Sequence, residues 1–119
     1  MEGIAAYQEN SVTTQSRGRI IVMLYEGCIK FLKQARQASH DADYQRKAYF
    51  LNKGVAILEE LNFALDLEKG GEVARNLRNL YLFMVRHLNQ ACISNEPHKI
   101  DEVISLLDEL NSGWKTVTE

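Results

Sequence analysis

The strongest constraint on the fold is the apolar pattern between Leu65 and Asn95, which is interrupted by Gly70 and Gly71. After the glycines, apolar residues recur at three- and four-residue steps and therefore share one face of a helix. These residues are Val73, Leu77, Leu80, Tyr81, Met84, Leu88 and Ala91. Glycine tolerates the left-handed backbone that closes a helix, where a side chain would clash. The stretch therefore predicts the end of one helix, a break at the glycines and a second helix.

Three further segments show the same helical spacing. The first predicted helix begins after Ser16, which can cap it by accepting a backbone N–H, and runs to about Ala38. The second follows the polar turn 40–43, where an aspartate can cap it, and stops at the glycines. The fourth begins at Pro97, whose missing N–H costs nothing in a first turn. Their apolar stripes are Ile20, Leu24, Cys28, Phe31, Leu32 and Ala35, then Leu51, Val55, Leu58, Leu61 and Leu65, and last Ile100, Val103, Ile104, Leu107, Leu110 and Trp114.

Four helices joined by connections of a few residues predict an antiparallel bundle. Residues 1–15 show no sustained period and have few apolar groups, among them Ile4, Tyr7 and Val12. We therefore expect an all-α chain, with an irregular N-terminal cap segment over residues 1–15 and a four-helix bundle domain over residues 16–119.

Charge and composition exclude several classes of function. A formal net charge of −2 argues against a general nucleic-acid binder. Residues 17–38 carry five basic and one acidic residue, whereas residues 97–119 carry two basic and five acidic ones, a contrast typical of neighbouring helices in a bundle. The chain shows neither a signal-peptide pattern nor an apolar segment long enough to span a membrane. Cys28 and Cys92 are far apart and fall on apolar faces, which predicts reduced thiols in a cytoplasmic protein.

No catalytic, nucleotide-binding or metal-binding motif is present, so we expect neither an enzyme nor a cofactor. His87 is the one histidine that could serve a phosphotransfer domain. Such domains carry H-x-L-K-G, whereas this chain reads HLNQA, so a histidine at the edge of an apolar stripe is the better interpretation.

Apolar residues also occur away from the predicted core faces. Tyr49, Ala56 and Phe63 are seven residues apart, opposite the leucine stripe of their helix, and Val22, Ile29, Leu82 and Ile93 lie off the stripes of theirs. Either an irregular bundle or the N-terminal tail covers them, or they form a groove for a partner helix. Burial of four or five such side chains would contribute on the order of 5–10 kcal/mol before ordering costs.

Four segments in order resemble the FliS-type flagellar export chaperones. They are the tyrosine-bearing GIAAYQENSV, then RIIVMLYEGCIKFLKQA with its core Met23–Gly27, then EKGGE followed by Asn76-Leu77 and Leu80-Tyr81, and last DEVISLLDELNSGWKTV. One departure is Ser16-Arg17, where the family usually has Ser-Pro. The resemblance covers nearly the whole chain and implies a bundle chaperone.

The resemblance implies that hydrophobic grooves bind the disordered C-terminal segment of flagellin, prevent premature polymerisation and deliver it to a membrane export gate. The expected client-binding residues are Val22, Tyr25, Ile29, Tyr49, Ala56, Phe63 and Leu82. Ile4 and Tyr7 match positions of the N-terminal cap and export-gate contact. Without client, we expect a monomer or weak homodimer with no nucleic-acid partner and no membrane insertion. The alternative function is a self-associating bundle with a regulatory or structural role.

Overall fold

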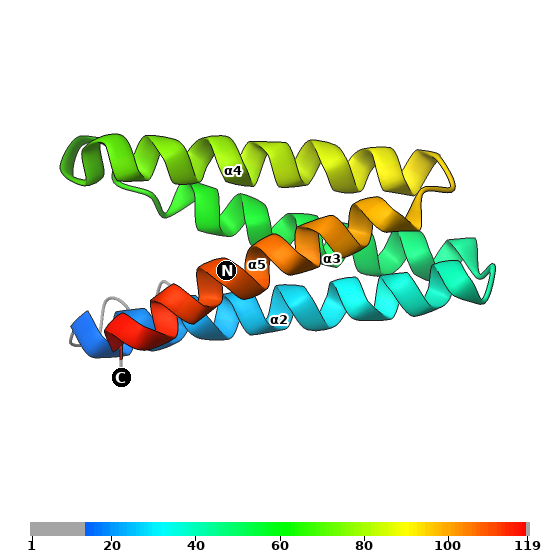
Figure 1. Ribbon diagram of the computed structural model, residues 1–119, viewed down its shortest axis with the longest axis horizontal. Coiled ribbons are helices and arrows are strands. Elements are labelled where there is room, and N and C mark those ends of the chain that lie inside the picture. The colour runs from blue at the N-terminus through cyan, green and yellow to red at the C-terminus, as the bar shows by residue number, and fades with distance from the viewer. Residues whose placement is uncertain (1–13, 119) are drawn as a thin grey trace.

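The computed structural model describes residues 14–118, which form four helices and no strand. The helices are α2 (Thr14–His40), α3 (Tyr44–Phe63), α4 (Leu67–Ile93) and α5 (Pro97–Thr118). Successive helices run in opposite directions, so that the start of α2 and the end of α5 lie at the same end of the molecule (Figure 1). The predicted antiparallel four-helix bundle is confirmed. Residues 1–13 of the expected cap segment lie outside the described residues.

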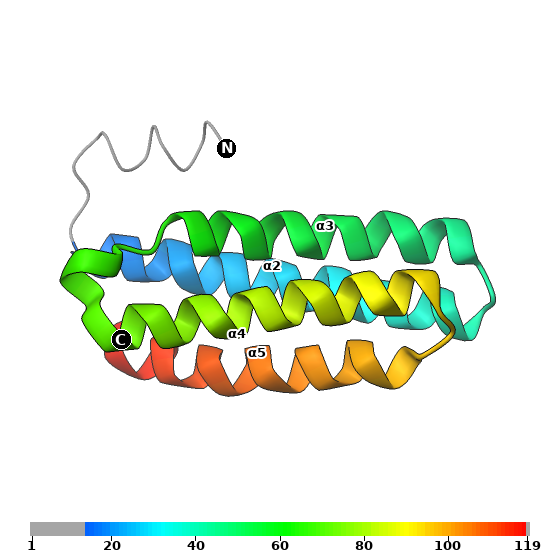
Figure 2. The same ribbon diagram turned by 90° about the horizontal axis from the view of Figure 1, so that it is seen from above.

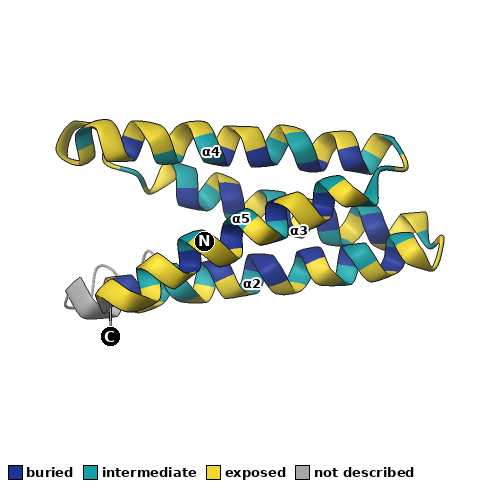
Figure 3. Ribbon diagram, in the orientation of Figure 1, coloured by how far each residue is buried: buried dark blue, intermediate teal, exposed yellow. Residues whose placement is uncertain are grey.

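Each helix packs against two neighbours. Helices α3 and α5 both contact α2, and both also contact α4. The α2/α5 pair and the α3/α4 pair therefore form opposite sides of the bundle, and Figure 2 shows the four helices side by side along their length. Buried residues line the inward faces (Figure 3). The fully buried large side chains are Tyr25, Leu32, Leu51, Leu58, Met84, Leu88, Ile100, Leu107, Val103 and Cys28.

Two of the predicted helix starts are confirmed and one is wrong. The side chain of Asp43 caps α3 by accepting a hydrogen bond from the Arg46 backbone N–H at 3.2 Å. Pro97 is the first residue of α5, as its fixed φ favours. Helix α2, however, begins at Thr14, so Ser16 lies inside the helix and is not its cap.

The predicted break at the double glycine is present, but it does not separate the second helix from the third. Helix α3 ends at Phe63, and Asp66 caps α4 by accepting hydrogen bonds from the backbone N–H groups of Glu68 and Lys69. The favourable cap at Asp66 therefore starts α4 at Leu67, about one turn before the glycines in the sequence. Gly71 instead forms a kink inside α4, with φ 55° and ψ −132°, a backbone conformation that suits only glycine. Val73, just after the kink, is exposed rather than part of the core stripe.

The opposite charges of α2 and α5 do reflect neighbouring helices. The Nε of Arg36 lies 3.0 Å from the Asp101 carboxylate, and the Nζ of Lys115 lies 3.1 Å from Glu26. Exposed pairs of this kind contribute about 0–1 kcal/mol each, so they support the pairing of the two helices rather than the stability of the core.

Lys47 is the one buried cation among the described residues. Its Nζ donates to the backbone carbonyl oxygens of Ala91, at 3.0 Å, and of Ser94, at 3.5 Å. Those carbonyls belong to the last turn and the C-cap of α4. At this end of a helix no further turn follows to donate backbone N–H groups to them. The ammonium of an α3 residue therefore caps the negative end of the α4 dipole.

Candidate functional site

An exposed apolar surface next to a hollow lies between α3 and α4. Phe63, the last residue of α3, is 90% exposed, and Leu82 on α4 is 40% exposed. Both line a groove of about 270 Å³ between the two helices. The remaining lining residues are Leu58, Glu59, Asn62, Tyr81 and Val85. We refer to it as the α3/α4 groove; its wall is largely apolar, with one carboxylate and one amide.

Asn62 gives this groove an unsatisfied polar group. Its Oδ1 is buried and accepts no hydrogen bond. A buried acceptor without a partner costs about 1–3 kcal/mol of stability, so native structures usually pair such atoms. A ligand that donates an N–H to this oxygen would recover that energy once the Asn62 side chain, which is only partly buried, turns its Oδ1 towards the groove. The groove therefore combines exposed apolar area with an acceptor that lacks a donor.

Two of the predicted surface residues are not on the surface, and Tyr25 is the clearer case. It is fully buried, three residues before Cys28 on the core face of α2. Its hydroxyl lies 2.6 Å from that of Tyr81, and Trp114 also hydrogen-bonds to it. Burial raises the pKa of Tyr25 above its ordinary value, so the phenol stays neutral. Tyr25 is thus a core residue that joins α2 to α4 and α5.

Ile29 is the second correction. It is 8% exposed and belongs to the core cluster, because its face of α2 turns towards α5, and the little surface it keeps lines a hollow between these two helices. For Tyr25 and Ile29, the interpretation as an irregular bundle that buries the extra apolar residues is therefore the right one.

The other predicted residues separate into groups. Phe63 and Leu82 meet in the α3/α4 groove, whereas Tyr49 and Ala56 lie on the exposed face of α3 and Val22 is partly buried on α2. The Tyr49 ring packs edge-on against Phe50 at 5.1 Å between centroids. The structure thus brings two of the seven predicted residues together in one groove. Ile4 and Tyr7 lie outside the described residues.

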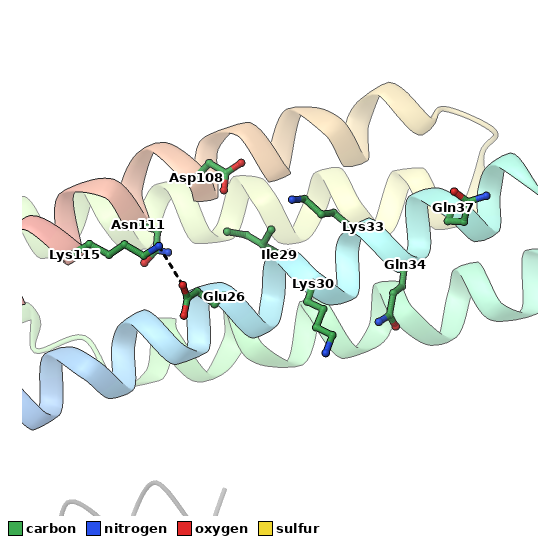
Figure 4. Close-up of a pocket in the computed structure, with 9 residues that line it drawn as sticks. All are labelled: Glu26, Ile29, Lys30, Lys33, Gln34, Gln37, Asp108, Asn111 and Lys115. Atoms are coloured by element: carbon green, nitrogen blue, oxygen red, sulfur yellow. Dashed lines mark ion pairs between the residues drawn. The ribbon is translucent and has the colours of Figure 1, made fainter.

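A second hollow lies on the opposite side of the bundle, between α2 and α5, and we refer to it as the α2/α5 groove (Figure 4). Its volume is about 520 Å³. The lining residues are Glu26, Ile29, Lys30, Lys33, Gln34, Gln37, Asp108, Asn111 and Lys115. Apart from Ile29 the lining is polar or charged, in contrast to the α3/α4 groove. Asn111 is 4% exposed, and its Oδ1 also lacks a hydrogen-bond partner.

The sequence interpretation missed both asparagines. A signal was present, because Asn62 follows Leu58 by four residues and Asn111 follows Leu107 by four, so each occupies a position of the apolar stripe. A polar residue at a core position is informative. Asn62 and Asn111 are the only described residues with a buried side-chain N or O atom that lacks a partner, and each lines a groove.

His87 packs between helices and does not project into either groove. Its Nε2 lies 2.5 Å from the Glu102 carboxylate on α5, and its ring stacks on Phe83 at 4.7 Å. The side chain is only 15% exposed. This arrangement joins α4 to α5 and does not favour the phosphotransfer alternative, which requires an accessible imidazole. Within residues 14–118, no cluster of three His, Cys, Asp or Glu side chains could hold a metal ion, and none of the helices has the length and hydropathy needed to cross a membrane.

Comparisons with known proteins agree with this architecture. The family described as "Flagellar protein FliS" matches residues 1–119. The flagellar secretion chaperone FliS of Campylobacter jejuni is 38% identical over 112 residues, which cover 94% of this chain and 88% of the relative. The flagellar secretion chaperone FliS of Salmonella typhimurium is 37% identical over 121 residues, which cover 98% of this chain and 90% of the relative. A solved structure titled "Crystal structure of flagellar chaperone from bacteria" superposes with a TM-score of 0.81 at 21% identity, over 98% of this chain and 95% of that one, and shows the same fold. The chain thus belongs to the FliS family of flagellar secretion chaperones.

Proposed function

We propose that this chaperone binds the C-terminal segment of flagellin in hydrophobic grooves of the bundle. Binding keeps the monomer from polymerising in the cytoplasm, and the complex then delivers flagellin to the export gate. The observation that carries the proposal is the exposure of Phe63 and Leu82 at the α3/α4 groove. Contiguous exposed apolar patches on soluble proteins often mark the binding site of a partner. Membership of the FliS family supports the same conclusion.

The α3/α4 groove has the features of a helix- or peptide-binding surface. Full burial of Phe63 by a client contributes about 1.5–3 kcal/mol, and Leu82, which is 40% exposed, contributes less than half as much. When the Asn62 side chain turns its buried Oδ1 towards the groove, a client N–H donated to it adds a directional contact at the same place. These gains offset the ordering cost of a disordered segment that folds as it binds, so no nucleotide or metal is required.

The client path extends beyond this groove. Tyr49 and Ala56 on the outer face of α3 and the partly buried Val22 on α2 provide further apolar area. Ile4 and Tyr7 serve as the cap and export-gate contact. The variant Ile4→Ala/Tyr7→Ala is therefore expected to retain most client affinity while flagellin export falls. Loss of binding, with normal export of the bound fraction, would contradict this division of roles.

Titration with the synthetic C-terminal segment of flagellin from the same organism tests the proposal. Calorimetry measures the affinity, and far-UV circular dichroism compares the complex with the sum of its parts. We expect saturable binding with a gain in helix content, because the segment folds on the bundle. Absence of binding by the folded protein at tens of micromolar would refute the proposal. A molecular mass that rises with concentration in the absence of client would then favour the self-associating bundle.

A further inference from the structure

The α2/α5 groove differs from the α3/α4 groove in position and in chemistry. It lies on the opposite side of the bundle, so a segment bound there leaves Phe63 and Leu82 free. Ile29 supplies its apolar centre, and charged and amide side chains surround it (Figure 4). Its volume of about 520 Å³ is within the range of ligand pockets.

The charges on the α2 wall of this groove are unbalanced. Glu26 and Lys115 neutralise one another across one end. Lys30 and Lys33, both exposed on α2, form no ion pair with any residue that the structure describes. Asp108 is the only acidic lining residue outside the Glu26–Lys115 pair. The wall is therefore locally positive on a protein whose formal net charge is −2, and it is complementary to carboxylates.

Asn111 provides the second, independent observation. It is 4% exposed, and its Oδ1 has no hydrogen-bond partner, although an apolar residue would suit its position between Leu107 and Trp114. Figure 4 shows Asn111 beside the Glu26–Lys115 ion pair. The side chains of Lys115 and Glu26 are 48% and 53% exposed, so this end of the groove can open at little cost in free energy. A donor from a bound segment could then reach the Asn111 amide oxygen.

We propose that the α2/α5 groove is a second docking site, which takes an acidic amphipathic segment of a protein partner. An apolar residue of the segment packs on Ile29, its carboxylates face Lys30 and Lys33, and one of its N–H groups donates to Asn111. This site goes beyond flagellin binding, since it uses the other helix pair and a different chemistry. The chaperone thereby holds two protein segments at once.

Two synthetic helical peptides of about 18 residues test the charge preference. Both carry the same leucine stripe, and the remaining positions are glutamate in one and lysine in the other. We expect the glutamate peptide to bind the full-length protein more tightly, and increasing salt to weaken its binding. The variant Lys30→Glu/Lys33→Glu should weaken the glutamate peptide by about tenfold and strengthen the lysine peptide. Equal binding of the two peptides, or no response to this charge reversal, would overturn the proposal.

The side-chain amides of Asn62 and Asn111, one in each groove, report where the peptide binds. In ¹⁵N-labelled protein, the glutamate peptide should shift the side-chain amide resonances of Asn111 and leave those of Asn62 in place. The flagellin segment should shift Asn62 and should not displace the peptide, which separates this proposal from the proposed function. Shifts at Asn62 alone, or competition between the two ligands, would place the peptide in the α3/α4 groove and refute a second site.

Asn111→Leu distinguishes a binding role from a structural one. Removal of an unpaired buried oxygen should raise the melting temperature of the free protein. The same change should weaken the glutamate peptide, because the segment loses its acceptor. Asn62→Leu is the matched control, which should raise stability without affecting this peptide. A variant Asn111→Leu that is more stable and binds the peptide normally would show that Asn111 has no part in docking.

Discussion

Phe63→Asp is the most direct test of the α3/α4 groove, because the chain contains a matched control. Phe63 and Ile93 are both 90% exposed, but only Phe63 lines the groove. In the free protein either substitution should change the free energy of unfolding by no more than about 0.5 kcal/mol, since neither side chain is packed. Burial of Phe63 by the client contributes about 1.5–3 kcal/mol. The variant Phe63→Asp should therefore raise the dissociation constant of the flagellin segment about 10- to 100-fold.

Calorimetry at constant pH and ionic strength measures the two variants against the parent protein, and urea unfolding confirms that each is folded. Ile93→Asp should bind within about twofold of the parent, because it adds the same charge outside the groove. Equal weakening by both variants would show that the added charge, not the groove, determines affinity. Normal binding by Phe63→Asp would show that the client does not cover this side chain.

Three further predictions concern the bundle itself. Tyr25→Phe should lower the free energy of unfolding by about 1 kcal/mol or more, because it leaves the buried Tyr81 hydroxyl without its partner. Tyr81→Phe should cost less, because Trp114 still hydrogen-bonds to Tyr25, and the two changes together should cost less than the sum. Gly71→Ala should destabilise by about 1–3 kcal/mol through backbone strain, whereas Gly113→Ala, at an open helical position, should stabilise by about 0.5–1 kcal/mol. Burial raises the pKa of Cys28 from 9.0 to about 12, so the folded state holds the thiol proton more tightly than the unfolded state. The contribution of Cys28 to the free energy of unfolding should therefore be fully present below pH 9.0 and be lost between pH 9.0 and about 12.

Urea midpoints measure all three predictions. Additive losses for the tyrosine pair would show that the two hydroxyls do not depend on one another. Equal effects of alanine at Gly71 and Gly113 would show that the kink is not strained. The variant Cys28→Ala should flatten the alkaline decline, and an unchanged slope would assign that decline to other groups.

Helix periodicity predicted most of the fold. The stripes that contain Leu51 and Leu58, or Ile100 and Leu107, carry enough buried area to specify a helix and its inward face. Pro97 marked a helix start correctly because its restriction is local. The connection between α3 and α4 was misplaced because two local signals competed there. The cap at Asp66 starts a helix ahead of the glycines, and a kink at Gly71 then accommodates the break that the glycine pair suggested.

The candidate site was predictable only in part. Phe63 and Leu82 were recognised because they lie outside the stripes of their own helices. Tyr25 and Ile29 were misjudged because burial depends on the neighbouring helix: α4 and α5 cover Tyr25, and α5 covers Ile29. Spacing within one helix describes the direction of a side chain but not what lies opposite. The pairing of Asn62 and Asn111 with the two grooves likewise required the packing of helices that are distant in sequence.

The two ends of α4 are anchored in different ways, and this has a consequence for how the helix opens. At its C-terminal end Lys47 holds the final carbonyls from α3, while near its N-terminal end Gly71 interrupts the helical backbone. Local opening should therefore start at the Gly71 end and progress towards Ala91. Amide hydrogen exchange along α4 should accordingly be graded, fastest near the kink and slowest where the buried ammonium closes the last turn. The helix that forms one wall of the α3/α4 groove is thus hinged from one end, so the groove can widen for a client without separation of the whole bundle.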